Sequence, residues 1–301
     1  MNERKYRLSI WGGIYKELGV YKAIDRLIEN GFYAMEYPDV FTEQYLKLPR
    51  EEYMAEAEKI RAYAAERNFE ISQGHLLFKH PFLGDEPLEL LKKNIDFLEA
   101  VGVKNMVLHV MGNKPGISLR KLKRKYYKKQ LARIKELLDY IGDRDIVICL
   151  ENIVQNPNTE ASEYILDYIH DCDNSPHLGI CLDTGHLNRS VGLGHVDETF
   201  EEFFKKSEGR IKALHVNGNA GSDDLHQFPF TGKEGHRPDW VNFITALNNS
   251  DYCGLYNYET PGERNFVPMK VRDYKLQYAK KLFEYMTSDE FVNDPDSDKW
   301  K

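Results

Sequence analysis

The feature that most constrains this chain is a regular alternation of short β-rich runs and longer amphipathic segments from one end to the other. Eight runs are predicted as strands, and each is followed by apolar residues at helical spacing, for instance Leu90, Leu91, Ile95 and Leu98. The predicted strands cover residues 7–11, 33–37, 70–75, 105–110, 146–152, 178–183, 211–216 and 254–259. This rhythm indicates an α/β protein with a parallel sheet.

Glycines mark the ends of four of the predicted helices. Gly31, Gly102, Gly142 and Gly209 each stand shortly before a predicted strand, where a helix commonly ends in a left-handed glycine. Eight βα units in 301 residues predict a single (β/α)8 TIM barrel. A doubly wound sheet also alternates, but it usually has about five or six strands and a glycine-rich phosphate loop, which residues 11–13 do not provide.

The chain is predicted to form one main domain. No linker rich in proline, glycine or serine divides it, so we expect the barrel to span residues 1–287. The remaining residues, 288–301, form a polar, acidic tail that we expect to be loosely attached. The four cysteines lie far apart without metal-site spacing, which disfavours a disulfide framework or a zinc ribbon.

Charge and hydropathy restrict the partners. The chain has 41 Lys and Arg against 48 Asp and Glu, and its net charge of -7 repels a polyanion, which disfavours nucleic acid as a partner. No apolar run approaches the roughly 18 residues of a membrane span. The N-terminal residues also lack the apolar core of a signal peptide. We therefore expect a cytoplasmic protein without membrane contact.

The strand ends carry residues of metal-ligand type, and in this kind of barrel catalytic groups stand there. The last six predicted strands end at or near His75, His109, Glu151, Asp183, His215 and Glu259. Because His, Asp and Glu make up roughly a fifth of the chain, six such ends arise by chance with a probability on the order of 10⁻⁴. Side chains two positions earlier are predicted to form the next barrel layer, namely Gln73, Val107, Cys149, Cys181, Ala213 and Asn257.

These side chains suit a metal ion. Two glutamates, one aspartate and one histidine form a mainly oxygen shell that fits Mn²⁺, Mg²⁺, Co²⁺ or, less selectively, Zn²⁺. Carboxylates gathered without a cation would repel one another. Three further residues are placed to reach the same centre: His186, which follows Asp183 by three positions, and the pair Asp224 and His226 after the seventh strand.

Several segments resemble the xylose-isomerase-like barrels, a superfamily of sugar isomerases and epimerases together with endonuclease-IV-type apurinic endonucleases. The segments are GHLLF, VLHV, VICLEN, GICLDTGH, ALHVNGN, DLHQFPFTGKEG and YNYETPG. In the ketose epimerase branch, the resemblance implies one divalent metal ion held by Glu151, Asp183, His215 and Glu259. It also implies that the two glutamates are the catalytic acid/base pair and that His186 contacts a substrate oxygen.

The chemistry agrees with that implication. A dication bound by a carbonyl and the neighbouring hydroxyl stabilises an enediolate, which lowers the cost of removing a proton from carbon. A carboxylate on each face of the substrate can then remove and return the proton. Return to the opposite face of the same carbon gives an epimer, and return to the adjacent carbon gives an isomer.

The endonuclease branch is the main alternative, because it uses a larger ligand set for up to three zinc ions. The matching positions are His75, His109, Glu151, Asp183, His186, His215, Asp224, His226 and Glu259. Three features favour the sugar interpretation. Glu36 in the second strand resembles a pocket residue of the isomerase branch, and residues 238–240, which precede a helix, also resemble that branch. The third feature is the negative net charge, which disfavours DNA as a substrate.

We therefore predict a metal-dependent isomerase or epimerase acting on a small-molecule sugar or sugar phosphate. The residues expected to face the substrate are His75, His109, His186, Asp224, His226, Glu36 and Trp11. The epimerases commonly carry an arginine shortly after the strand-seven histidine, and this chain does not, which leaves Lys233 and Arg237 as the nearest cations in sequence. A dehydratase or lyase acting on a keto-sugar or cyclitol would use the same ligands, and a non-catalytic binding barrel is the least favoured interpretation. The resemblance is also compatible with a homo-oligomer.

Overall fold

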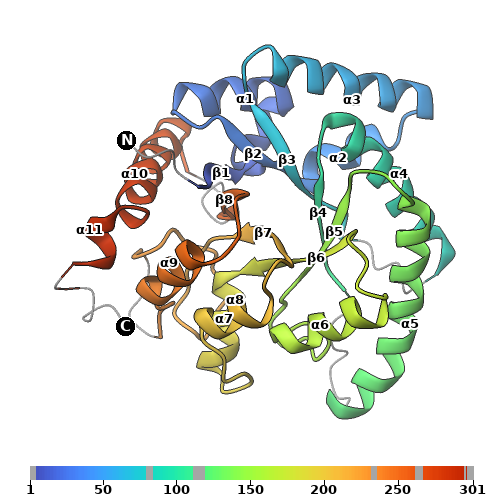
Figure 1. Cartoon of the computed structure of the whole chain (residues 1–301). Coiled ribbons are helices and arrows are strands. Elements are labelled where there is room, and N and C mark those ends of the chain that lie inside the picture. The colour runs from blue at the N-terminus through green and yellow to red at the C-terminus, as the bar shows by residue number, and fades with distance from the viewer. Residues whose placement is uncertain are drawn as a thin grey trace.

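The computed structural model describes residues 5–78, 84–110, 119–231, 236–261, 267–294 and 296. Eight parallel strands pair in the order β7-β6-β5-β4-β3-β2-β1-β8. A parallel bridge between Val216 and Tyr258 joins the two outer strands, and Val216 donates its backbone N–H to Asn257 over 2.8 Å. The sheet therefore closes into a barrel surrounded by helices (Figure 1), and the predicted TIM barrel is confirmed.

All eight predicted strands are present, and their ends differ from the prediction by at most two residues. The difference arises because residues next to a loop often do not pair with the neighbouring strand. They are β1 Arg7–Trp11, β2 Ala34–Tyr37, β3 Glu70–His75, β4 Asn105–Leu108, β5 Val147–Glu151, β6 Leu178–Asp183, β7 Ile211–His215 and β8 Leu255–Tyr258.

The helices pack around the outside of the barrel (Figure 1). They are the 3-10 helix η1 Gly12–Leu18, α1 Gly19–Glu29, α2 Asp39–Tyr45, α3 Arg50–Ala65, α4 Asp85–Val101, α5 Leu119–Ile141, α6 Ser162–Asp171, α7 Thr184–Gly192, α8 Phe200–Lys206, α9 Trp240–Asn249, α10 Met269–Met286 and α11 Asp289–Val292. Among the described residues, none of these helices combines the length and the apolar character needed to cross a bilayer.

Glycine ends the helices where the sequence predicts it. Gly31, Gly102, Gly142 and Gly209 have φ of +81°, +113°, +58° and +72°, a region that L side chains rarely adopt. Gly102 shows the consequence most clearly: its N–H bonds to the carbonyl of Leu98 over 3.1 Å, which closes α4 and turns the chain into β4.

The interior of the barrel is filled below the strand ends by small side chains. Val107, Cys149, Cys181 and Ala213 form a separate, fully buried cluster, and Gln73 and Asn257 of the same predicted layer are also buried. The layer predicted from strand alternation is confirmed. Because its members are small, the larger ligand-type side chains above it can lie across the barrel axis.

The beginning of the C-terminal tail packs against the barrel. Helix α11 contacts α9 and α10, and the ring of Phe291 is fully buried, 5.3 Å from Tyr285 and 6.1 Å from Phe230. The Tyr285 hydroxyl donates to Asp294 over 2.6 Å. The expected loose attachment is therefore wrong for residues 288–294, because one aromatic anchor in a polar segment is enough to hold it. Residues 295 and 297–301 of the predicted tail lie outside the described residues.

Replacing that anchor should destabilise the whole domain. Phe291→Ala removes a fully buried ring and should lower the free energy of unfolding by about 3 kcal/mol. Denaturant unfolding measures the loss, and Glu290→Gln, an exposed neighbour, is the matched control. A loss no larger than that of the control would mean that α11 does not contribute to the folded domain.

Candidate metal centre

The C-terminal ends of four consecutive strands bring together the four predicted metal ligands. Glu151 ends β5, Asp183 ends β6, His215 ends β7 and Glu259 directly follows β8. Each offers one ligand atom, and these atoms lie within 4.8 Å of one another. All four side chains are buried. The register of the barrel produces this convergence, since Asp183 and His215 are direct partners across β6 and β7.

Asparagines hold Asp183 in place. Asn152 donates to the Asp183 carbonyl over 3.0 Å and accepts its N–H over 2.6 Å, which fixes the ends of β5 and β6 together. Asn217 donates to Asp183 Oδ2 over 2.6 Å, and Oδ1 accepts the N–H of His186 over 2.7 Å. The second contact caps the start of α7. Both carboxylate oxygens therefore have a fixed direction.

Glu36 of β2 orients His215 from behind. His215 donates from Nε2 to Glu36 Oε2 over 2.7 Å, and Gln73 donates to the same oxygen over 2.6 Å. The other ring nitrogen, Nδ1, faces Glu151 Oε1 and Glu259 Oε2 at 3.4 Å each. A carboxylate on one imidazole nitrogen fixes the tautomer and leaves the other nitrogen free to bind a metal. Sequence reasoning placed Glu36 in the pocket wall, whereas the structure buries it fully behind the ligand.

Atoms without partners test whether these residues fit a cation. His215 Nδ1 and Glu259 Oε2 are buried and have no hydrogen-bond partner among the described residues. Buried polar atoms are nearly always satisfied, so two such atoms 3.4 Å apart need a common partner. A divalent cation bound by both would satisfy them together with the neighbouring carboxylates. The donor set therefore fits the metal ion that the sequence predicts.

The histidines predicted to face the substrate extend the cluster on one side. His75 donates from Nδ1 to the Leu76 carbonyl over 2.7 Å, which leaves its Nε2 directed at His109 Nε2 at 3.2 Å. His109 Nε2 lies 2.6 Å from Glu151 Oε2. His75, His109 and Glu151 form a second group with metal-ligand spacing, which shares Glu151 with the first group.

A third group lies on the other side and shares Asp183. It consists of Asp183, His186 and His226. His186 Nδ1 lies 3.0 Å from Glu151 Oε1, and His226 Nδ1 lies 2.9 Å from Glu259 Oε2. Asp224 stands between the two rings, 3.4 Å from His186 Nε2 and 3.5 Å from His226 Nε2. The structure therefore brings together all nine strand-end and loop residues that were predicted as ligand types.

The loop after β7 folds back so that Asp224 and His226 can reach the cluster. Gly218 and Gln227 form a short antiparallel bridge with backbone hydrogen bonds of 2.7 and 2.9 Å. His226 has a φ of +47°, an unfavourable conformation for a non-glycine residue, and it is maintained where its ring meets Glu259. Such retained strain is typical of a functional position.

The electrostatics of the cluster are those of a site that binds either protons or a cation. Burial, reinforced by the carboxylates of Glu259 and Glu151, raises the pKa of Asp183 to about 7. Burial also opposes ionisation of Glu151 and Glu259, but the surrounding imidazoles lower the pKa of both carboxyl groups. The carboxylates in turn raise the pKa of His215 although burial lowers it. A bound dication would replace the protons that balance these charges.

Two residues near the mouth were not foreseen. Phe78 is 54% exposed, and its ring centroid lies 4.6 Å from that of His75 and 4.8 Å from that of His109. Arg189 lies on α7 one turn after His186, with Nη1 3.9 Å from Asp224 Oδ2. The three-residue spacing from His186 is the sequence signal that could have found Arg189, because such residues share one helix face.

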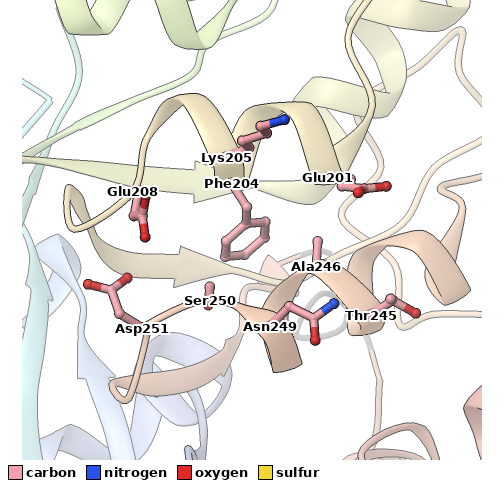
Figure 2. A pocket seen from close by; sticks show the side chains of 9 residues that line it. All are labelled: Glu201, Phe204, Lys205, Glu208, Thr245, Ala246, Asn249, Ser250 and Asp251. Carbon is pink, nitrogen blue, oxygen red and sulfur yellow. The ribbon is translucent and has the colours of Figure 1, made fainter.

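The remaining predicted positions are Trp11, Lys233 and Arg237. Trp11 is buried, with its indole packed against Gly13 where no Cβ could fit. Arg237 lines a cavity of about 270 Å³ between α7, α8 and α9, whose lining includes no ligand residue. Lys233 lies outside the described residues. Figure 2 shows a further groove of about 350 Å³ between α8 and α9, into which Phe204 points and which also shares no residue with the cluster.

Residues 24–286 match the family described as the xylose isomerase-like TIM barrel. The chain belongs to this family. The match covers seven of the eight strands, including every strand that supplies a ligand.

Solved structures share the fold over nearly the whole chain. A D-tagatose 3-epimerase-like protein superimposes with a TM-score of 0.72 at 19% identity, covering 96% of this chain and 98% of its own. D-allulose 3-epimerase from Methylomonas sp. has a TM-score of 0.68 at 18% identity, and the match covers 93% of this chain and 98% of the epimerase. The IOLI protein, solved with a bound zinc atom, has a TM-score of 0.66 at 16% identity, and the match covers 94% of this chain and 98% of the IOLI chain.

Sequence relatives cover less. An uncharacterised protein of Sinorhizobium fredii is 25% identical over 192 residues, which are 63% of this chain and 58% of the relative. A probable endonuclease 4 of Staphylococcus carnosus is 27% identical over 154 residues, which are 49% of each protein. The chain thus spans about half the length of the curated relatives it matches.

The contact between Glu36 and His215 gives a direct test of this centre. Glu36→Gln removes the charge that holds the His215 tautomer and should weaken binding of Mn²⁺ about 10- to 100-fold, as measured by calorimetric titration. The matched control is Glu70→Gln at the start of β3, where the side chain pairs with Arg7. Equal affinity in the Glu36 variant and the wild-type protein would contradict the arrangement.

Proposed function

We propose that this protein is a divalent-metal-dependent isomerase or epimerase of a sugar or sugar phosphate. The observation that carries the proposal is the convergence of Glu151, Asp183, His215 and Glu259 within 4.8 Å, with the free nitrogen of His215 turned into the group. The metal is one divalent ion, of which Mn²⁺, Mg²⁺, Co²⁺ and Zn²⁺ all suit the donors.

A divalent ion held by Glu151, Asp183, His215 and Glu259 would supply electrophilic chemistry, which would lower the cost of removing a proton from a carbon beside a carbonyl. Glu151 and Glu259 move that proton. They stand three strands apart around the barrel, so their carboxyl groups approach a bound substrate from different sides. The pKa of each is lowered by neighbouring imidazoles, so each is ionised near neutral pH, as a proton acceptor must be.

His186 supports this chemistry from α7. Its Nδ1 is buried without a hydrogen-bond partner among the described residues and lies 3.0 Å from Glu151 Oε1. In this position it can donate to a substrate oxygen beside the carboxylate that moves the proton. The similar solved structures named as epimerases of tagatose and allulose support the same class of substrate.

A second function is favoured by a specific observation. The two additional groups, one with His75 and His109 and the other with His186 and His226, give the site the capacity for up to three ions, and several ions together can activate water to hydrolyse a phosphodiester. The relatives named as probable endonuclease 4 support this alternative. The net charge of -7 disfavours a nucleic-acid substrate, so we rank the alternative second.

The two functions predict different products. With Mn²⁺ bound, the protein should exchange a carbon-bound hydrogen of a ketose with solvent deuterium and convert the ketose into an epimer or isomer, as followed by NMR. Glu259→Gln should lower kcat about 10²- to 10⁴-fold, because the amide cannot accept the proton. Glu208→Gln, in the groove between α8 and α9, is the control.

The contrary result is equally specific. Three zinc ions per chain, cleavage of a DNA duplex at an abasic site and no exchange with any ketose or sugar phosphate would reject the proposal in favour of the hydrolase. Exchange accompanied by loss of water from a keto-sugar would instead assign a dehydratase or lyase to the same residues.

A further inference from the structure

Arg189 stands beside the metal centre with most of its donors unused by the described part of the chain. Its side chain is 22% exposed, and its Nε is buried without a hydrogen-bond partner among the described residues. Its ion pair is with Asp224 Oδ2 at 3.9 Å, beyond the range of a hydrogen bond. A guanidinium carries five donors in a fixed fork, so the described residues leave this one mostly unsatisfied.

Asp224 does not account for the position of Arg189. Its carboxylate already lies between the rings of His186 and His226, at 3.4 and 3.5 Å. The guanidinium is therefore farther from Asp224 than either imidazole is, and its N–H donors form no hydrogen bond to that carboxylate.

The location of Arg189 connects it to the substrate. Helix α7 begins at Asp183, whose carboxylate caps it, so that His186 and Arg189 project from one face of a helix that is fixed to the metal centre. Asp224 Oδ2 is shared between these two side chains. The guanidinium is therefore separated by a single carboxylate from His186, the side chain proposed to contact the substrate.

The unpaired N–H donors of Arg189 indicate which chemical group it can bind. Arginine binds phosphate and carboxylate groups through two parallel N–H donors, whereas a neutral hydroxyl uses one. The four carboxylates of Glu151, Asp183, Asp224 and Glu259 would repel an anionic substrate, and a cation at the mouth offsets that repulsion. The unused fork is therefore better suited to an anionic group than to a sugar hydroxyl.

We propose that Arg189 binds an anionic group of the substrate, either a phosphate or a carboxylate, and so makes an acidic sugar the preferred substrate. This inference rests on the proposed function, which identifies the rest of the substrate as a sugar. The anion-binding step itself does not depend on the reaction.

Inorganic phosphate and acetate are the probes of the anion site. Calorimetric titration of the Mn²⁺-loaded full chain should detect phosphate or acetate, and Arg189→Met should weaken that binding at least about tenfold, as expected for loss of a charge-assisted bidentate contact. Arg237→Met, in the separate cavity beside α7, is the matched control and should leave the affinity unchanged. The anion whose affinity depends on Arg189 identifies the group.

Kinetics extend the test to the substrate. For a ketose phosphate or sugar acid that exchanges hydrogen, Arg189→Met should raise KM at least about tenfold, Arg189→Lys should restore part of the loss, and the KM of the neutral ketose should change less than about twofold. If no sugar exchanges, the proposed function fails while the anion titration still decides the role of Arg189.

Two results would overturn the inference. Equal phosphate and acetate affinity in the wild-type protein and Arg189→Met would mean that the metal alone holds the anion. Loss of bound Mn²⁺ in Arg189→Met would mean that the arginine serves to position Asp224.

Discussion

The site depends on one hydrogen bond across the barrel interior, from His215 to Glu36. These residues come from β7 and β2, which are not neighbours in the sheet, so only a closed barrel brings them together. The bond fixes which nitrogen of His215 faces the carboxylates, and Gln73 fixes Glu36 in turn. Without this support the ring of His215 would have no fixed orientation, and neither nitrogen would be held toward the carboxylates.

The fold and the convergence of the strand-end residues could be predicted because both follow from local patterns. Alternating strands and helices define the barrel, and in a parallel barrel every strand ends at the same mouth. The rings of His75 and His215 therefore lie 6.0 Å apart although these residues are distant in sequence. The glycine that ends α4, Gly102, is equally local. Predicting these features requires only the spacing of apolar residues along the chain and the residue type at each strand or helix end.

The remaining features depend on contacts that no local pattern contains. The role of Glu36 could not be predicted without knowing which residue lies opposite it in the barrel. A buried glutamate in a strand is equally compatible with a place in the pocket wall. Arg189 required the fold of the loop that carries Asp224. The packing of Phe291 required the position of α11 against α9 and α10. In each case the partner is supplied by a segment far away in sequence.

The geometry also explains why one barrel is similar both to sugar epimerases and to probable endonucleases. A central group of four ligands shares Glu151 with the histidines on one side and Asp183 with those on the other. Under the proposed function, the number of these groups that bind an ion at the same time would determine the chemistry, because one ion assists proton transfer at carbon and several ions activate water. Occupancy is therefore the property that separates the two functions.

The most direct measurement is anomalous scattering from crystals grown with Mn²⁺. We expect one dominant peak about 2.0–2.3 Å from Glu151, Asp183, His215 Nδ1 and Glu259, with the His215 to Glu36 hydrogen bond retained. A dominant peak at His75 and His109, or no peak at the central group, would contradict this assignment of the metal centre.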